Sequence, residues 1–535
     1  MLSTESGRRR TFAVISHPDA GKTTLTEKLL LFSGAIHVAG AVKGRKSRRF
    51  ATSDWMEIEK QRGISVASSV MQFVYRDTVF NLLDTPGHDD FSEDTYRVLT
   101  AVDAAVMVID GVNGVEAQTI KLLDVCRRRR TPIITFINKL DRDVRPPIEL
   151  LSDVERHLGV AAVPFSWPIG TGKGFCGVYD LRKGQILRFQ RGSATRSPDT
   201  VVLQITDDQR VRAELGGVWS ETKDEIELAS GATPRFDRAS FLAGLQSPVL
   251  FGSAVNNFGV EELLDALVDL APPPSIRIAD QRAVDPVDSQ FTGMVFKVQA
   301  NMDPMHRDRV AFVRVCSGRF MRGMALTVSK SGKRIKTNNV VTFLSQRRDL
   351  ADEAFPGDII GIPNHGSICL GDTLTEGEKL SFSGLPFFSP EIFRAVEATD
   401  PIRGKHLNEA LRQLGEEGAI QVFRPVTTSA VLLGAVGALQ FDVVAHRLAN
   451  EYRVDVRFLP SSYRLSRWVT SEDPVALKRF CESNAARIAI DAAGALTLLG
   501  RHPAELSTLR ELWPNVSFSH LREYSHQSAV TTAAA

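Results

Sequence analysis

The sequence predicts an α/β fold in three parts: a domain with a parallel sheet and an inserted subdomain, a β-barrel, and a C-terminal α+β domain. In the first part, apolar runs of strand length alternate with helical patterns. From residue 291 to about 387, short strands and glycine turns follow one another without a helix of usual length, which favours a small barrel. The expected boundaries are 1–280 for the first domain, about 155–247 for the insertion, 281–388 for the barrel, and 389–535 for the third domain with a disordered tail.

The composition excludes several classes of protein. A chain of 535 residues can form three or four domains, each with its own core. The formal net charge is only +2, so contact with nucleic acid would depend on local patches. Five cysteines without C-x-x-C spacing argue against a disulfide framework or a zinc site. No apolar run is long enough to span a membrane and the N-terminus lacks a signal-peptide core, so we expect a cytoplasmic protein without membrane contact.

The first motif is a loop between a predicted strand at 12–15 and a predicted helix at 24–32. It consists of Ser16-His17-Pro18-Asp19-Ala20-Gly21-Lys22-Thr23-Thr24. Backbone N–H groups in the second half of this loop can point at phosphate oxygens, and the positive end of the helix dipole adds to them. Lys22 supplies a positive charge for the β- and γ-phosphates, and the Thr23 hydroxyl suits Mg²⁺.

One position departs from the phosphate-loop pattern G-x-x-x-x-G-K-[ST]. Ser16 stands where the first glycine should be, and Gly-Lys-Thr is a common triplet, so this stretch alone leaves an ordinary strand-to-helix turn open. A second Gly-Lys pair lies at Gly172-Lys173. It lacks a glycine five residues before Gly172, and Gly174 replaces the metal-binding hydroxyl, so we interpret it as a turn.

The second motif follows a predicted hairpin of strands at 70–75 and 79–83. It consists of Asp84-Thr85-Pro86-Gly87-His88. A carboxylate at the C-terminal end of a strand, followed by a glycine turn, is where an open α/β sheet places its ligand. Asp84 can reach Mg²⁺ through water, and the Gly87 N–H can bond the γ-phosphate. Asp-x-x-Gly alone is a common turn, but its position after a phosphate loop favours the functional interpretation.

The third motif, Asn138-Lys139-Leu140-Asp141, directly follows a predicted strand at 133–137. Guanine presents its N1–H and 2-amino groups side by side, and the Asp141 carboxylate can accept both hydrogen bonds. Adenine has neither donor and would leave that carboxylate unpaired, at a cost of about 1–3 kcal/mol. The Lys139 stem can lie over the base, while Asn138 can tie neighbouring loops together.

The fourth motif is Gly252-Ser253-Ala254, at the end of a predicted strand at 249–251. The backbone N–H groups of Ser253 and Ala254 are suited to the guanine O6 oxygen. Four motifs in this order, each at the end of a strand, predict GTP binding.

Other segments are less specific. The basic run at 43–49 is compatible with a flexible loop or with a loop that also contacts phosphate or RNA. In the third domain, Phe441, Val444, Ala445 and Leu448 share one face of a predicted helix between strands, which favours a split β-α-β arrangement. The composition of residues 526–535 favours disorder.

The four motifs together resemble the translational GTPase superfamily, and the loop at 16–24 resembles in particular its peptide chain release factor 3 family, the class II release factors. The resemblance covers almost the whole chain and weakens after about Asp473. It implies GTP or GDP and Mg²⁺ as ligands, and a monomeric protein whose partners are ribosomal RNA and ribosomal proteins. Three further stretches carry it: Asp89-Asp90-Phe91-Ser92-Glu93-Asp94-Thr95-Tyr96-Arg97; Asn301-Met302-Asp303-Pro304 with His306-Arg307-Asp308-Arg309; and Gly434-Ala435-Val436-Gly437 with Leu439-Gln440-Phe441-Asp442.

The resemblance also assigns roles to residues. His88 would position the attacking water once ribosomal RNA engages it, with Pro18 and Ile64 as an apolar gate beside it. Ser65 would be a further Mg²⁺ ligand. No arginine finger is recognisable in the sequence, so we expect slow intrinsic hydrolysis and strong stimulation by the ribosome. The implied output is dissociation of class I release factors from the ribosome after peptide release.

Two alternatives remain at this point. A factor like elongation factor G, or a ribosome-protection factor, is similar over the first half, but it needs a further domain that imitates a tRNA. A metabolic enzyme such as the sulfate-activating GTPase subunit has a related first domain and barrel. No added catalytic constellation supports that second alternative.

Overall fold

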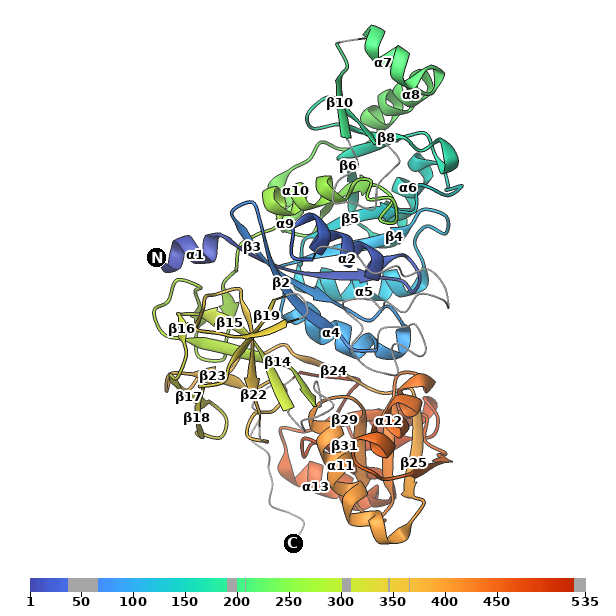
Figure 1. The fold of residues 1–535 in the computed structure, drawn as a ribbon. Helices are drawn as coiled ribbons and strands as arrows, with labels where there is room; N and C mark the ends of the chain where they lie inside the picture. Colours follow the sequence, from blue (N-terminus) through green and yellow to red (C-terminus); the bar gives the residue numbers. More distant parts are fainter. Residues whose placement is uncertain are drawn as a thin grey trace.

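The computed structural model describes residues 1–36, 66–189, 200–206, 208–300, 309–344, 347–364 and 366–523. Figure 1 shows a central α/β part from which α7 (Asp208–Leu215) and α8 (Gly217–Ala232) project on one side. The strands from β14 (Thr292–Ala300) to β23 (Thr373–Thr375) and the C-terminal part lie on the other side of it (Figure 1). The predictions for residues 43–49, Ile64, Ser65 and 526–535 fall outside the described residues.

The central part contains a parallel sheet with one antiparallel edge. Its strands follow the order β2-β3-β1-β4-β5-β11-β6, and only the β2–β3 pairing is antiparallel. Every residue of β4 and β5 is buried, as expected for strands covered by helices on both faces. The strands are β1 (Arg9–Ser16), β2 (Ser69–Tyr75), β3 (Thr78–Asp84), β4 (Ala104–Asp110), β5 (Ile133–Asn138), β6 (Ala161–Pro164) and β11 (Gln246–Phe251). The helices are α1 (Leu2–Gly7), α2 (Lys22–Phe32), α4 (Ser92–Thr100), α5 (Ala117–Arg129), α6 (Pro147–Leu158), α9 (Arg238–Leu242) and α10 (Val260–Leu270).

Helix α10 illustrates how the sequence builds the layers around this sheet. Its buried side chains recur at the helical spacing i, i+3, i+4 and i+7, namely Val260, Leu263, Leu264 and Leu267. Gly259 precedes the helix with a φ of 77°, a left-handed conformation that favours glycine. The acidic first turn complements the positive end of the helix dipole.

The insertion forms a sheet of its own. The order is β10-β9-β8-β7, and all three pairings are antiparallel. Helices α7 and α8 follow these strands, and Trp219 of α8 lies in the small core that they share. The strands are β7 (Ser166–Ile169), β8 (Gly177–Asp180), β9 (Gln185–Phe189) and β10 (Thr200–Gln204). These elements lie within the predicted insertion, whose limits stay a prediction.

The antiparallel strands after residue 290 curl into the predicted barrel and also continue the central sheet, because β19 pairs with β2 through Leu344 and Gln72. The strands are β14, β15 (Arg309–Ser317), β16 (Phe320–Met321), β17 (Ala325–Val328), β18 (Arg334–Lys336), β19 (Val341–Leu344), β20 (Arg347–Leu350), β21 (Glu353–Ala354), β22 (Ile359–Pro363) and β23. A short connection, β12 (Arg277–Ile278) paired with β13 (Ala283–Val284), leads from α10 to the barrel.

The C-terminal part is an eight-stranded sheet with helices, in the order β28-β25-β27-β26-β30-β31-β29-β32. Its strands are β25 (Ile392–Ala398), β26 (Gln421–Pro425), β27 (Val431–Ala435), β28 (Val456–Pro460), β29 (Leu465–Thr470), β30 (Ile488–Asp491), β31 (Leu496–Gly500) and β32 (Ser517–Ser519). The helices are α11 (Gly404–Glu416), α12 (Ala438–Asn450), α13 (Pro474–Ser483) and α14 (Ala504–Leu512). Two outer strands, β24 (Pro386–Phe388) and β33 (Leu521–Glu523), pair with each other, so the chain returns to the start of this part.

The predicted fold class is thus confirmed: an α/β domain with an insertion, a barrel and an α+β domain. The predicted helix with the Phe441 face is α12, and Phe441, Val444 and Leu448 are buried in it. In the segment after Asp473, where the resemblance weakened, the described residues form helices and strands, and Phe480 lies in an apolar cluster that also includes Leu465 and Val469. Among the helices that the structure describes, none is long and apolar enough to cross a bilayer.

Candidate nucleotide-binding site

The loop between β1 and α2 has the backbone of a phosphate cradle. Asp19 and Gly21 both adopt left-handed conformations, with φ of 62° and 95°. A Cβ on Gly21 would lie 2.3 Å from Asn138 Nδ2, so glycine is required here both by the backbone and by the close neighbour. Gly21 immediately precedes α2, so the free N–H groups of the first turn face the loop. Ser16 is buried at the end of β1, and its hydroxyl donates to His17 O at 2.8 Å.

The lysine of this loop is paired with the carboxylate of the second motif. Lys22 Nζ lies 2.5 Å from Asp84 Oδ1, and both side chains are almost completely buried. The other oxygen, Asp84 Oδ2, is buried and has no hydrogen-bond partner among the residues that the structure describes. Thr23 and Thr24, in the first turn of α2, are half-buried. The free carboxylate oxygen of Asp84 and the Thr23 hydroxyl are both oxygen ligands of the kind that Mg²⁺ prefers, so these residues fit the ion.

The second motif packs directly on the first. The Thr85 hydroxyl donates to Val14 O at 2.8 Å, and Pro86 O accepts a hydrogen bond from the Thr95 hydroxyl. A Cβ on Gly87 would lie 3.5 Å from Pro18 Cα, so the backbone of Gly87 passes next to the loop. The predicted γ-phosphate contact and the predicted cradle are therefore neighbours.

His88 begins the short 3₁₀ helix η1 (Asp89–Phe91) that leads into α4. Its Nδ1 atom lies 3.3 Å from both the backbone nitrogen and the Oδ1 atom of Asp90. The imidazole is 35% exposed and lies near the Phe91 ring. The side chain is thus accessible at the edge of the site and is held by contacts from its own turn.

The base-selecting motifs are joined to the loop through Asn138. Its Nδ2 donates to Ala20 O at 2.9 Å, and its Oδ1 accepts from the Ala254 N–H at 2.9 Å. The Ser253 hydroxyl donates to Asp141 Oδ1 at 2.6 Å. Together these three contacts bring the first, third and fourth motifs into one site, as the sequence predicted for loops at the same edge of a parallel sheet.

Lys139 and Leu140 have different surroundings. Lys139 adopts a φ of 70°, and its Nζ donates to Asp110 Oδ2 at 2.6 Å. Leu140 is buried, and its N–H donates to Gly252 O at 3.1 Å. The second Gly-Lys pair, at Gly172-Lys173, forms a 3₁₀ turn whose Gly172 N–H donates to Leu140 O. That stretch is a turn, as predicted.

Two acidic residues of the site were missed in the sequence. Asp110 ends β4 and holds Lys139, and Glu116 lies 3.3 Å from His17 Nε2 through its Oε1 atom. Asp110 had a usable signal, because it is the last residue of a fully buried strand, as Asp84 is of β3. Glu116 had none, since it lies in an irregular segment before α5. Of the residues predicted for the site, Ile64 and Ser65 are not among the described residues, and the assignment of the others to a nucleotide site stays a prediction.

Comparisons with known proteins place this geometry in a family. The model of the elongation factor Tu GTP binding domain matches residues 7–273, and that of elongation factor G domain 2 matches residues 290–377. The C-terminal domain of class II release factor RF3 matches residues 382–510. A peptide chain release factor 3 from Bordetella petrii is 63% identical over 527 residues, covering 98% of each chain. The chain belongs to the peptide chain release factor 3 family.

A second relative agrees with this, and a solved structure is similar in fold. Peptide chain release factor 3 from Nitrosomonas europaea is 61% identical over 522 residues, covering 97% of this chain and 98% of that protein. A crystal structure of a protein from Thermus thermophilus has a TM-score of 0.68 at 25% identity, and covers 87% of this chain and 69% of that one. As a member of the peptide chain release factor 3 family, the protein is a GTPase of translation termination that binds guanine nucleotides and hydrolyses GTP. The resemblance inferred from the sequence is confirmed, and the release-factor interpretation is favoured over the elongation-factor alternative.

Proposed function

We propose that the protein uses GTP on the ribosome to dissociate class I release factors after peptide release, so that few copies of such a factor serve many ribosomes. The match of the class II release factor C-terminal domain to residues 382–510 carries this proposal. It is the part of the chain that distinguishes a release factor from other proteins with a related first domain and barrel. We place the protein in the cytoplasm as a monomer.

The proposed GTP site comprises the loop at 16–24, the turn at 84–88, the motif at 138–141, and Ser253 with Ala254. The loop would hold the phosphates through backbone N–H groups and Lys22. The Asp141 carboxylate would accept from guanine N1–H and the 2-amino group, and the Ser253 hydroxyl that donates to it at 2.6 Å would keep it oriented. Thr23, Asp84 and Ser65 would hold Mg²⁺, which, when bound, neutralises charge on the β- and γ-phosphates.

His88 is the residue proposed to act in hydrolysis. A water molecule attacks the γ-phosphorus, the bond to the β,γ-bridging oxygen breaks, and GDP and inorganic phosphate leave, the proton of the water going to phosphate or solvent. The His88 imidazole would orient that water, with Pro18 and Ile64 on either side. Its exposed edge leaves it open to contact with ribosomal RNA.

The nucleotide would act on the bound class I release factor indirectly, because that factor and the GTP form of this protein would prefer different states of the ribosome. A ribosome state that fits the GTP form of this protein and fits the class I factor poorly shifts the population towards dissociation. We also propose the division into domains at 1–280, 281–388 and 389–535. The barrel strands and the eight-stranded sheet belong to separate sheets, and among the described residues only β24 and β33 pair across the second boundary, at its edge.

The test is peptide release from stop-codon complexes with substoichiometric class I release factor, with and without this protein and GTP. We expect the number of peptides released per class I factor to rise several-fold with GTP, and we expect no release from this protein alone. A His88→Ala protein serves as the matched control that binds nucleotide. Unchanged turnover of the class I factor, together with stimulated tRNA translocation, would favour the elongation-factor alternative instead.

A further inference from the structure

One carboxylate lies between the proposed water-orienting histidine and the third domain. Asp90 Oδ1 is 3.3 Å from His88 Nδ1, and Asp90 Oδ2 accepts a hydrogen bond from the Leu439 N–H at 2.6 Å. Leu439 lies in the first turn of α12, so a side chain of the first domain reaches the start of a helix in the third. The two contacts use different oxygens of the same group.

Helix α12 depends on this contact for its N-terminus. The residue before it, Gly437, has no side chain to accept from the free N–H groups of the first turn. Gln440 Oε1 accepts from the Val436 N–H at 2.7 Å, and Asp90 supplies the acceptor for Leu439. Asp90 therefore acts as an N-cap from another domain, and its negative charge lies at the positive end of the helix dipole.

Gly437 supports this interpretation independently. Its φ of −136° is accessible to any residue, so its backbone conformation does not require glycine. A Cβ at this position would lie 2.0 Å from Asp90 Cγ and 2.1 Å from Asp90 Oδ1. The glycine is therefore needed because the carboxylate passes so close to it, and any side chain here would displace Asp90.

The first turn of α12 is also packed against the first domain by apolar contacts. Phe91, which follows Asp90, lies in a buried cluster with Val443, and Leu439 packs on the cluster. The cap and the apolar contact thus join the same short 3₁₀ helix to the same helix end. Movement of α12 away from the first domain would remove both.

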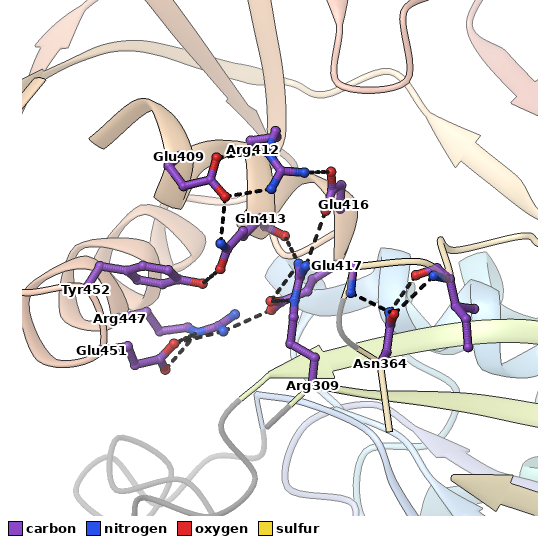
Figure 2. Close-up of polar contacts among 12 residues, drawn as sticks. Arg309, Asn364, Glu409, Arg412, Gln413, Glu416, Glu417, Arg447, Glu451 and Tyr452 are labelled. Atoms are coloured by element: carbon purple, nitrogen blue, oxygen red, sulfur yellow. Dashed lines mark hydrogen bonds and ion pairs between the residues drawn. The ribbon is translucent and has the colours of Figure 1, made fainter. Parts of the chain in front are cut away.

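The C-terminal end of α12 is fixed by a network of ion pairs, which Figure 2 shows. The Arg447 guanidinium donates to Glu417 Oε2 at 2.9 Å, and Arg309 of the barrel lies 3.3 Å from Glu417 Oε1. Arg309 also donates to Gln413 O at 2.9 Å, near the end of α11. Glu417 is buried between the two guanidinium groups, so the position of α12 relative to the barrel is well defined. The next residue, Gly418, accepts a hydrogen bond from Arg97 of α4 through its carbonyl.

We propose that Asp90 is a positioning residue for GTP hydrolysis, through which the seating of α12 on the first domain fixes the His88 imidazole. With α12 seated, the carboxylate is held by Leu439 and the ring is confined at Nδ1. With α12 displaced, the carboxylate loses its anchor, and the ring turns more freely about its two side-chain torsions. The third domain thereby controls how often the imidazole is in place to orient water. This inference rests on the role proposed for His88.

The experiment compares Gly437→Ala, Asp90→Ser and the double variant with wild type in ribosome-stimulated GTP hydrolysis. Gly404→Ala, at the start of α11, is the matched control, because its backbone is helical and no atom lies within 4 Å of the added Cβ. We expect Gly437→Ala to lower kcat at saturating ribosomes and GTP by roughly 10- to 100-fold, as for a misplaced catalytic group. The affinity for GTP should stay unchanged, because Asp90 and Gly437 would act on the site only through His88, whose proposed contact is with water rather than with nucleotide.

The double variant decides how Gly437 acts. If the added methyl group works by displacing the carboxylate, the double variant should equal Asp90→Ser alone, because no carboxylate remains to be displaced. If the kcat of the double variant falls by the product of the two single-variant factors, the proposal is overturned. It would also be overturned if Gly437→Ala changed only the KM for ribosomes and kcat stayed within twofold of Gly404→Ala, because that pattern indicates a purely structural contact.

His88→Ala separates this inference from the function on which it rests. If His88→Ala leaves ribosome-stimulated hydrolysis intact, the role of His88 itself is wrong. If His88→Ala abolishes hydrolysis while Gly437→Ala and Asp90→Ser match the Gly404→Ala control, the role of His88 stands and only the positioning by Asp90 is wrong. Thermal unfolding of each variant checks that the fold is retained.

Discussion

Lys22 Nζ lies 2.5 Å from Asp84 Oδ1, which joins the phosphate loop to the end of β3 in a pair that is almost fully buried. A phosphate bound in the loop would share this lysine with Asp84. Lys22→Ala should therefore weaken GTP binding by at least 100-fold and also destabilise the domain by about 3–5 kcal/mol, since it leaves a buried carboxylate without its cation. GTP titration and chemical unfolding measure the two effects.

The matched control is Lys173→Ala, which changes the lysine of the second Gly-Lys pair. That residue lies in the turn η2 (Gly172–Gly174) beside the base-selecting motif. We expect GTP affinity within about twofold of wild type. An equal loss of affinity in both variants would mean that the loop at 16–24 is not the phosphate site.

The second prediction concerns the choice of base. Asp141→Asn replaces one acceptor oxygen by a donor, so the affinity for GTP should fall by about 10-fold or more, and xanthosine triphosphate, which has an oxygen at C2, should bind better. Competition binding with both nucleotides measures this. Asp143→Asn, two residues further along, is the control and should keep the preference for GTP. If Asp141→Asn keeps it too, Asp141 does not contact the base.

The third prediction separates binding from hydrolysis. His88→Ala should leave the dissociation constant for GTP nearly unchanged, because the proposed contact of the imidazole is with water rather than with nucleotide. Ribosome-stimulated hydrolysis should fall by several orders of magnitude, because the attacking water would no longer be oriented. Equilibrium binding and single-turnover hydrolysis are compared on one preparation. A parallel loss of GTP affinity would contradict the separate roles of His88 and Lys22.

The site was predictable from the sequence because its parts are local. Each motif directly follows a strand, and parallel neighbours bring these strand ends to one edge. For the same reason Asn138 could be expected to tie loops together, and it does so between Ala20 and Ala254. Asp110 could have been found by the same rule, whereas Glu116 could not.

The contacts between domains could not be predicted in this way. Asp90 and Leu439 are 349 residues apart, and Arg314 and Asp103 are 211 residues apart. No periodicity or motif spacing links such pairs, because they depend on how finished domains pack. Gly437 shows the limit most clearly: it is a glycine at an ordinary φ, and only the approach of the Asp90 carboxylate explains it.

The fourth prediction concerns pH. Burial raises the pKa of Glu262, on the first turn of α10, from its ordinary 4.5 to about 7, and the neighbouring Glu261 and Asp265 add to this. Between about pH 4.5 and 7, the folded protein therefore keeps a proton on Glu262 that the unfolded chain has already released. Stability from this group falls as the pH rises through that window and is constant above it.

Glu262→Gln removes this pH dependence. The free energy of unfolding of the variant, taken relative to wild type, should therefore be about 1–3 kcal/mol higher at pH 8 than at pH 4.5. Chemical unfolding at the two pH values measures it. Glu221→Gln, exposed on α8, is the control and should show no such difference. A Glu262→Gln variant that gains nothing at pH 8 would show that the carboxyl is ionised without penalty in the folded protein.

The fifth prediction concerns the attachment of the barrel to the first domain. Arg314 of β15 donates to Asp103 Oδ2 at 2.5 Å and to Ala101 O at 2.6 Å, and its side chain is only 1% exposed. Arg319 of the same barrel pairs with Glu353 on the surface, where both side chains are at least 40% exposed. The two pairs have the same chemistry in different surroundings, so they test how burial determines the effect of losing one partner.

Arg314→Leu should destabilise the protein by about 3–5 kcal/mol, because the guanidinium is lost from a buried carboxylate and from a buried carbonyl. Arg319→Leu should cost less than about 1 kcal/mol, because its pair is solvated. The midpoint of the first unfolding transition in urea compares the two variants in the full chain. Similar shifts would show that the buried pair does not hold the barrel to the first domain. Arg277 also approaches Asp103, at 3.4 Å, and would then be the residue that compensates the carboxylate.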